Sequence, residues 1–197
     1  MWRIGMTGSI ATGKSTVLDA FKALGVPVFS ADAAVAELYA GEAVAPVEAA
    51  FPGSSVNGAI DKVLLSQKLA ANPAGFQRLE AIVHPLVRAR ISNFMDEAQQ
   101  SGAALAVVEV PLLFESGYDY GFDAIGVTVV DDAIQRQRAL ARPGMTVEKL
   151  NAILARQLPQ AEKRARATYL FDTGHGLKPT LEMVAALVDG IKVRQGS

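Results

Sequence analysis

The sequence predicts a three-layer α/β protein with a parallel sheet, a large helical insertion and a basic helical segment. Two observations support this prediction. Short apolar runs rich in β-branched residues alternate with helical stretches, which is typical of strands buried in a parallel sheet. In addition, residues 33–101 hold no convincing strand, although an ordinary crossover needs only about a dozen residues.

Five apolar runs are the expected strands, at residues 2–7, 26–29, 105–110, 125–130 and 168–171. A glycine-containing loop follows the first run, and a helix is expected from Lys14 to Leu24. Gly25 is placed to end that helix as a C-cap. A later helix should begin at Asp131 and Asp132. The order of strand, loop and helix predicts a ligand site at the carboxyl edge of the sheet.

Three parts are expected along the chain. The core comprises residues 1–32, 102–135 and 167–197, the helical insertion residues 33–101, and a basic segment residues 136–166. A crossover as long as the insertion needs a function of its own, and a cap over the carboxyl edge of the sheet fits. Within it, the dipeptide His84-Pro85 is expected to mark a helix boundary.

The charge is balanced overall and uneven locally. The 197 residues carry 19 Lys and Arg against 20 Asp and Glu, a net charge of -1, and half of them are hydrophobic, which argues against a disordered or nucleic-acid-coating tail. Segment 136–166 holds eight basic and two acidic residues, a local charge of +6 against -7 for the rest. It is either a solvated pair of basic helices or an element that closes over a polyanion.

The inventory of residues excludes further classes of site. The absence of Cys excludes disulfides, thiolate metal sites and Cys nucleophiles, and the presence of only two His argues against a His-based metal site. The first residues lack the apolar region of a signal peptide, and the richest apolar stretch is interrupted by Glu109 and Pro111. We expect a soluble cytoplasmic protein that binds no nucleic acid or membrane and needs no obligate protein partner.

One motif determines the expected chemistry. The first loop matches G-x-x-x-x-G-K-[ST] between a strand and a helix, and comprises Gly8, Ser9, Ile10, Ala11, Thr12, Gly13, Lys14 and Ser15, followed by Thr16. In such a P-loop the backbone N–H groups cradle phosphates, Lys14 reaches the β- and γ-phosphates, and the Ser15 hydroxyl ligates Mg²⁺. The fold expected is therefore of the P-loop NTPase type, with ATP and Mg²⁺ as its ligands.

A P-loop alone leaves a small-molecule kinase, a GTP-dependent switch and an ATPase motor open. The guanine-reading motif N-K-x-D does not occur, and the D-x-x-G spacing at 123–126 precedes a strand instead of ending one. A motor would normally be longer or repeat its modules. The kinase is favoured, and a switch whose insertion contacts a protein partner is the alternative from another class.

Carboxylates follow two of the expected strands. Asp32 lies at the ligand edge, where it could accept or orient the proton of an acceptor hydroxyl, or simply cap a helix beginning at Ala33. Glu109 and Glu115 bracket residues 111–114, and carboxylates at a strand's carboxyl end can hold Mg²⁺ through water. For Glu115 a cap or a salt bridge is the alternative. Leu112, Leu113 and Phe114 are expected in the core or as pocket lining.

Two arginines of the basic segment are candidates for phosphate contacts. Arg138 and Arg142 are four residues apart, hence expected on one face of a helix, where two guanidinium groups suit bidentate binding of phosphates. Asp172, after the last expected strand, again lies on the ligand edge or caps a helix.

With these motifs in place, the chain resembles the dephospho-coenzyme A kinase family over nearly its full length. The resemblance rests on the P-loop followed by Ser15 and Thr16, Ala31-Asp32, residues 58–61, Leu79-Glu80 with His84-Pro85, residues 110–115, Arg138 with Arg142, and Gln157 before Lys163. It implies a P-loop core, a helical insertion that binds coenzyme A and a mobile lid. The implied reaction transfers the γ-phosphoryl group of ATP to the ribose 3′-hydroxyl of dephospho-coenzyme A, with a nucleoside monophosphate as the alternative acceptor.

The resemblance also assigns roles to residues. Asp32 would be the base or hydroxyl-orienting group, with Lys14 and Arg142 as its catalytic companions, and Arg138 and Arg142 would contact ATP as the lid closes. The acceptor would be bound by Asp32, Lys62, His84 and the segment with Leu112, Leu113, Phe114 and Glu115. The sequence departs from the family pattern at Ser30, Lys62, Pro143, Thr168 and Thr173. Lys62 cannot reproduce a bidentate arginine contact.

Overall fold

The computed structural model describes residues 1–72 and 74–195. These form two compact units, Met1–Phe29 with Met95–Ser197, and Ser30–Phe94. The second unit corresponds to most of the expected insertion, residues 33–101, but it begins at Ser30 and ends at Phe94. The expected lid, residues 136–166, is part of the first unit. Each unit is described below by itself.

The first unit contains a five-stranded sheet of β1 (Trp2–Gly8), β2 (Val28–Ser30), β5 (Leu105–Glu109), β6 (Ala124–Val129) and β7 (Tyr169–Asp172). The strand order is β2-β5-β1-β6-β7, and β1 pairs in parallel with both β5 and β6. The prediction of five strands in a parallel sheet is confirmed. β1 is central in this order, so the loop that follows it opens at the middle of the carboxyl edge.

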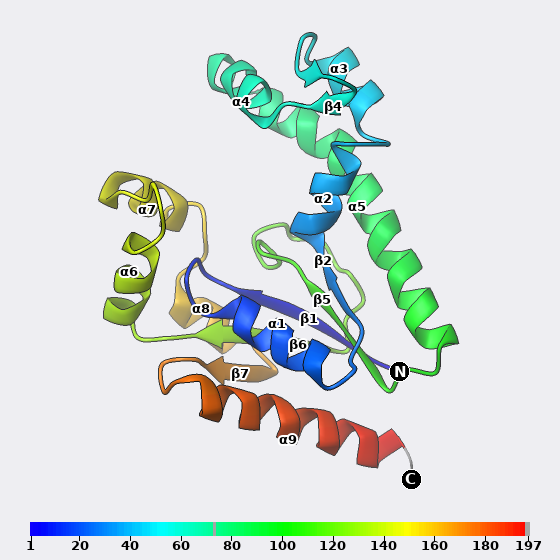
Figure 1. Cartoon of the computed structure of the whole chain (residues 1–197), viewed down its shortest axis with the longest axis vertical. Coiled ribbons are helices and arrows are strands. Elements are labelled where there is room, and N and C mark those ends of the chain that lie inside the picture. Colours follow the sequence, from blue (N-terminus) through cyan, green and yellow to red (C-terminus); the bar gives the residue numbers. More distant parts are fainter. Residues whose placement is uncertain (73, 196–197) are drawn as a thin grey trace. The chain divides into compact units, whose positions relative to one another are not determined.

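Helices pack against this sheet. On one face, α1 (Lys14–Ala23) and α9 (Leu177–Gln195) pack together, and Figure 1 shows them beside the strands. Their apolar side chains share one core cluster with β1 and β5, in which Phe21 and Phe171 meet edge to face at 6.0 Å. All five residues of β5 are buried, so its other face is covered as well. Gly25 follows α1 with φ of 74°, which confirms the predicted glycine cap.

The basic segment folds as short helices, α6 (Asp132–Leu140), α7 (Val147–Leu154) and α8 (Gln160–Ala165). α6 begins where predicted, because the Asp131 side chain accepts the N–H of Ala133 at 2.8 Å. The prediction that Arg138 and Arg142 share one helix face is wrong, since α6 ends at Leu140 and Arg142 lies in the following turn. Pro143 and Gly144, the latter at φ of 72°, cannot continue the helix.

The second unit is mostly helical, with α2 (Ala31–Leu38), α3 (Val44–Ala50), α4 (Lys62–Ala71) and most of α5 (Gly75–Gln100). The expectation of no strand in 33–101 is wrong, because β3 (Ser55–Val56) and β4 (Ala59–Ile60) form a small antiparallel hairpin. Asn57 and Gly58 have φ of 52° and 81°, as a two-residue hairpin turn requires. Strands of two residues are too short to show an apolar period.

The predicted helix boundary at His84-Pro85 is also wrong, because α5 runs through Pro85. A proline inside a helix removes one N–H and strains the preceding turn. In α5 this loss is outweighed by a continuous apolar face, since Val83, Val87 and Ile91 are all buried. Among the described residues, no helix has the length and apolarity that crossing a bilayer demands.

Candidate active site

The P-loop connects β1 to α1 in a conformation that demands small residues. Ala11 and Gly13 have positive φ, 60° and 83°. A Cβ on Gly8 would lie 2.0 Å from Oγ1 of Thr128, and one on Gly13 would lie 2.7 Å from Oγ1 of Thr173. Because α1 begins at Lys14, the N–H groups of its first turn have no carbonyl partner within the helix. They and the positive end of the helix dipole form an anion site.

Buried threonines fix the base of this loop. The Thr12 hydroxyl donates to the carbonyl oxygen of Ser9 at 2.8 Å. The hydroxyl oxygens of Thr12 and Thr128 lie 2.7 Å apart and share a hydrogen bond. The Thr173 hydroxyl donates to the carbonyl oxygen of Thr12 at 2.9 Å. All three threonines are buried. The loop is therefore bonded to β6 and to the residue after β7.

Lys14 has a protein partner within the site. Its Nζ lies 3.0 Å from Oε1 of Glu109, the last residue of β5, and both side chains are mostly buried. The sequence placed Glu109 at the ligand edge, where a carboxylate can hold Mg²⁺ through water, and left its role open. The parallel register brings the two together, since Met6 in β1 is opposite Glu109 in β5. The Lys14 charge is thus held at the mouth of the P-loop.

Arg138 is anchored on Thr173. Its two terminal nitrogens donate to the hydroxyl and to the carbonyl oxygen of Thr173, both at 2.9 Å. Arg142 is exposed in the turn after α6. Asp172 accepts the N–H of Gly174 at 2.9 Å and so holds the turn after β7. Phosphate contacts by either arginine stay a prediction.

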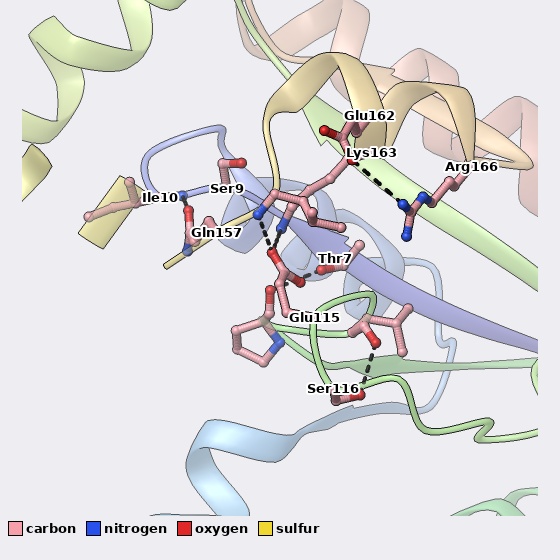
Figure 2. A network of polar contacts seen from close by, with 12 residues as sticks. Thr7, Ser9, Ile10, Glu115, Ser116, Gln157, Glu162, Lys163 and Arg166 are labelled. Carbon is pink, nitrogen blue, oxygen red and sulfur yellow. Dashed lines mark hydrogen bonds and ion pairs between the residues drawn. The ribbon is translucent and has the colours of Figure 1, made fainter. Parts of the chain in front are cut away.

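The segment after β5 is held by polar contacts on both sides. The Thr7 hydroxyl donates to the carbonyl oxygen of Pro111 at 3.0 Å. Oε1 of Glu115 accepts the N–H of Leu158 at 2.7 Å and lies 2.9 Å from Nζ of Lys163, as Figure 2 shows. Lys163 is 1% exposed, so this ion pair joins α8 to the segment inside the protein.

The surroundings of Glu115 set its charge. Burial alone raises the pKa of the Glu115 carboxyl, but the hydrogen bonds from Lys163 and from the backbone N–H groups of Leu158 and Glu115 outweigh it and lower the pKa below its usual value. The carboxylate is ionised and engaged within the protein. The salt bridge that was the alternative reading of this residue is present, and acceptor binding by Glu115 stays a prediction.

The three apolar residues before Glu115 lie in different surroundings. Leu112 is exposed at 43%, whereas Leu113 is buried at 5%. The Phe114 ring lies under the guanidinium of Arg166, 5.6 Å from its centroid. Leu113 is thus a core residue, while Leu112 offers an apolar side chain at the surface.

The other expected acceptor residues lie in the second unit. Ser30, and not Asp32, is the N-cap of α2, since its hydroxyl accepts the N–H of Ala33 at 3.4 Å. The interpretation of Asp32 as the cap of a helix beginning at Ala33 is therefore wrong, and Asp32 lies in the first turn of α2. Lys62 is the exposed first residue of α4, and His84 is exposed on α5.

Several polar residues of this site were missed or left without a role in the sequence. Thr128 and Thr173 bond the P-loop, and Glu109 pairs with Lys14. Gln135 and Gln157 contact the P-loop backbone as well, as described further below. No local signal identifies such residues, because their partners lie far away in the chain.

The donors present fit a nucleoside triphosphate. The P-loop offers backbone N–H groups, the Lys14 ammonium and the exposed Ser15 hydroxyl. In the described part of the chain, no group of three or more His, Asp or Glu side chains is arranged to hold a metal ion. Mg²⁺ in kinase sites is typically bound by one or two protein oxygens together with substrate phosphates, and Ser15 can supply one.

A parallel α/β sheet with a P-loop at its carboxyl edge and a helical unit inserted after β2 defines the class of P-loop kinases. A profile of the dephospho-CoA kinase family matches residues 2–178. The dephospho-CoA kinase of Rhodopseudomonas palustris strain HaA2 is 51% identical over 186 residues, which cover 94% of each chain. This chain belongs to the dephospho-CoA kinase family.

Solved structures agree with this assignment of the fold. TT1252 from Thermus thermophilus superposes with a TM-score of 0.82 at 32% identity, over 96% of each chain. The dephospho-CoA kinase of Campylobacter jejuni superposes with a TM-score of 0.67 at 22% identity, again over 96% of each chain. Membership of a kinase family makes the chain a transferase that phosphorylates an alcohol group and implies ATP as the co-substrate.

Proposed function

We propose that this chain transfers the γ-phosphoryl group of ATP to the ribose 3′-hydroxyl of dephospho-coenzyme A, giving coenzyme A and ADP. The observation that carries the proposal is the P-loop, with its positive φ angles and with Lys14 held beside Glu109. Family membership supports dephospho-coenzyme A as the acceptor. We place the reaction in the cytoplasm and expect it to need no membrane, nucleic acid or protein partner.

The nucleotide is bound by the P-loop. Backbone N–H groups of the P-loop and of the first turn of α1 surround the phosphates, and the Lys14 ammonium contacts the β- and γ-phosphates. Mg²⁺, held by the Ser15 hydroxyl and phosphate oxygens, would neutralise part of the phosphate charge. The positive charge of Arg142 stabilises the negative charge on the transferred phosphoryl group. Arg138 does so from its place beside Thr173, whose hydroxyl also donates to the P-loop carbonyl oxygen of Thr12.

For the acceptor we propose the residue roles that the family resemblance implies. Asp32 orients the attacking hydroxyl and accepts its proton, while Lys62 and His84 bind the phosphate-bearing body of the acceptor. Leu112, Leu113, Phe114 and Glu115 shape the acceptor side of the site, Leu113 and Glu115 through the packing and the ion pair that hold the segment in place.

Catalysis then depends on positioning and charge neutralisation. Phosphoryl transfer spreads negative charge over the transferred oxygens, and fixed cations stabilise it without reorganisation. Residues 136–166 act as a lid that excludes water, so that transfer to the acceptor is faster than hydrolysis. The local charge of +6 in that segment supports this role.

The test is ADP release by the purified protein with ATP and Mg²⁺, with and without dephospho-coenzyme A. Adenosine monophosphate and shikimate serve as control acceptors. Stimulation by dephospho-coenzyme A alone is expected. Stimulation by adenosine monophosphate instead would identify a nucleoside monophosphate kinase, and slow hydrolysis indifferent to every acceptor would identify a nucleotide switch. The Lys14→Met variant is the matched blank, and it should retain the wild-type circular dichroism spectrum while losing turnover.

A further inference from the structure

Ile10, at the tip of the P-loop, has both of its backbone polar groups bonded to glutamine side chains. Its N–H donates to Oε1 of Gln157 at 3.0 Å, and Figure 2 shows this bond. Its carbonyl oxygen accepts from Nε2 of Gln135 at 2.8 Å. Gln135 belongs to α6, and Gln157 lies between α7 and α8. The tip of the loop is therefore gripped from two sides by the segment 132–160.

The Gln135 contact continues into a chain of amides. Oε1 of Gln135 accepts from Nε2 of Gln160 at 3.1 Å, and the same Nε2 donates to Oδ1 of Asp132 at 2.8 Å. Oε1 of Gln160 in turn accepts the N–H of Val130 at 3.1 Å. Gln135 is buried, at 4% exposure. The chain joins the end of β6 to the P-loop through side chains alone.

The direction of every amide in this chain is dictated by backbone groups. A carbonyl oxygen can only accept a hydrogen bond and an N–H can only donate one. The Ile10 carbonyl oxygen therefore requires the NH₂ group of Gln135, and the Ile10 N–H requires the amide oxygen of Gln157. Val130 fixes Gln160 in the same way from the other end. The two glutamines at Ile10 thus have opposite duties, Gln157 as acceptor and Gln135 as donor.

Apolar packing reinforces the grip at the same place. Ala11 forms a small buried cluster with Ala139 and Leu150, and Ile10 packs against it. Ala11 also has φ of 60°, a left-handed conformation that a residue with a Cβ adopts only when its surroundings hold it there. The hydrogen bonds that Gln157 and Gln135 form with the backbone of Ile10 are suited to hold Ala11 in this conformation.

We propose that Gln157 and Gln135 are positioning residues that preset the tip of the P-loop for phosphate binding before nucleotide arrives. This inference rests on nucleotide binding by the proposed function. An unclamped loop would have to be ordered by the nucleotide itself, and that cost would reduce affinity. The effect should therefore appear in ATP binding and in the KM for ATP, and not in kcat at saturating ATP.

The first test replaces each amide by a thioether of similar length, in Gln157→Met and Gln135→Met. The matched control is Gln137→Met, because Gln137 is an exposed glutamine on the same helix. We expect the Kd for ATP, measured by titration calorimetry, to rise about five- to thirtyfold in the first two variants, as for one lost hydrogen bond. The control should stay within about twofold, as should kcat in all three.

The second test uses the opposite duties of the two amides. Gln157→Glu and Gln135→Glu add the same charge near Ile10, but a carboxylate can still accept the Ile10 N–H and cannot donate to the Ile10 carbonyl oxygen. Gln157→Glu should therefore bind ATP about tenfold more tightly than Gln135→Glu. Thermal unfolding of each variant without nucleotide provides the measure of purely structural damage.

Two results would overturn the inference. These are wild-type ATP affinity in both methionine variants, whatever their melting temperature, and equal affinities in the two glutamate variants. Because ATP binding is measured without acceptor, these outcomes do not depend on the acceptor's identity. A wild-type protein that binds ATP but shows no stimulation by dephospho-coenzyme A would instead reject the proposed function, and the affinities would still decide the role of the glutamines.

Discussion

Nζ of Lys14 lies 3.0 Å from Oε1 of Glu109, with 17% and 10% of the two side chains exposed. The pair joins the first residue of α1 to the last residue of β5. A cation this deeply placed needs a counter-charge, and the carboxylate provides one in the protein itself. In the proposed reaction the nucleotide phosphates take over that task.

Replacement of Glu109 tests this exchange. In Glu109→Gln the Lys14 charge loses an anionic partner, and the free energy of unfolding should fall by about 1–3 kcal/mol. ATP should then raise the melting temperature more than in the wild type, because its phosphates restore the missing counter-charge. Differential scanning fluorimetry with and without ATP measures both effects. The Lys14→Met/Glu109→Gln double variant is the control and should lose the extra response. Wild-type stability together with a wild-type ATP response would contradict the exchange.

The buried pair of Lys163 and Glu115 should be a strong local determinant of stability. Lys163→Met leaves the Glu115 carboxylate buried without its cation, and the free energy of unfolding should fall by about 3–5 kcal/mol. Lys163→Met/Glu115→Leu removes both charges and should recover most of the loss. Urea denaturation of the two variants and of Glu115→Leu completes a double-mutant cycle. A coupling energy near zero in that cycle would show that the pair is not a stabilising unit.

The turn held by the Glu48 carboxylate in the helical unit should lose stability in acid. Its carboxylate accepts the N–H groups of Gly53, Ser54 and Ser55, and these bonds lower its pKa from 4.5 to about 2. A lowered pKa stabilises the fold above the unfolded value of 4.5, and the gain disappears as the pH falls from there toward 2.

Glu48→Gln should consequently lower the melting temperature most above pH 5, and the difference from the wild type should shrink as the pH falls toward 3. Thermal unfolding followed by circular dichroism across this range checks it. Glu97→Gln, a change of an exposed carboxylate on α5, controls for the lost charge. A difference that is constant with pH would mean that the Glu48 carboxylate does not hold the turn.

Asp32 can now be separated from the cap of α2, because Ser30 occupies that position. Asp32→Asn should lower kcat for dephospho-coenzyme A by about a hundredfold or more, as expected for the loss of a group that accepts a proton. Its melting temperature should stay near the wild-type value. Ser30→Ala is the comparison and should reduce the free energy of unfolding by about 0.5–1 kcal/mol. An Asp32→Asn enzyme with a near-normal rate would remove Asp32 from the chemistry.

Local signals in the sequence were enough to predict the parallel sheet, the P-loop and the helix that follows it. The P-loop motif, the apolar strands on either side of it and the glycine that ends α1 all act through neighbours a few residues away. The Asn57-Gly58 turn was a local signal too, but its strands are only two residues long and went unpredicted. At Pro85 the local signal misled, because the buried face of α5 outweighs one lost hydrogen bond.

The partners of the polar side chains were decided only by the tertiary structure. Gln135 meets Ile10 across 125 residues, and Thr173 meets Thr12 across 161. The spacing of glutamate, glutamine and threonine along the sequence does not indicate their hydrogen-bond partners, and each side chain can bond equally well to water. Strand order and register choose among these possibilities by bringing the ends of β1, β5, β6 and β7 to one edge. The sequence by itself determined that a phosphate-binding loop would form, and the packing of distant segments decided which side chains hold it in shape.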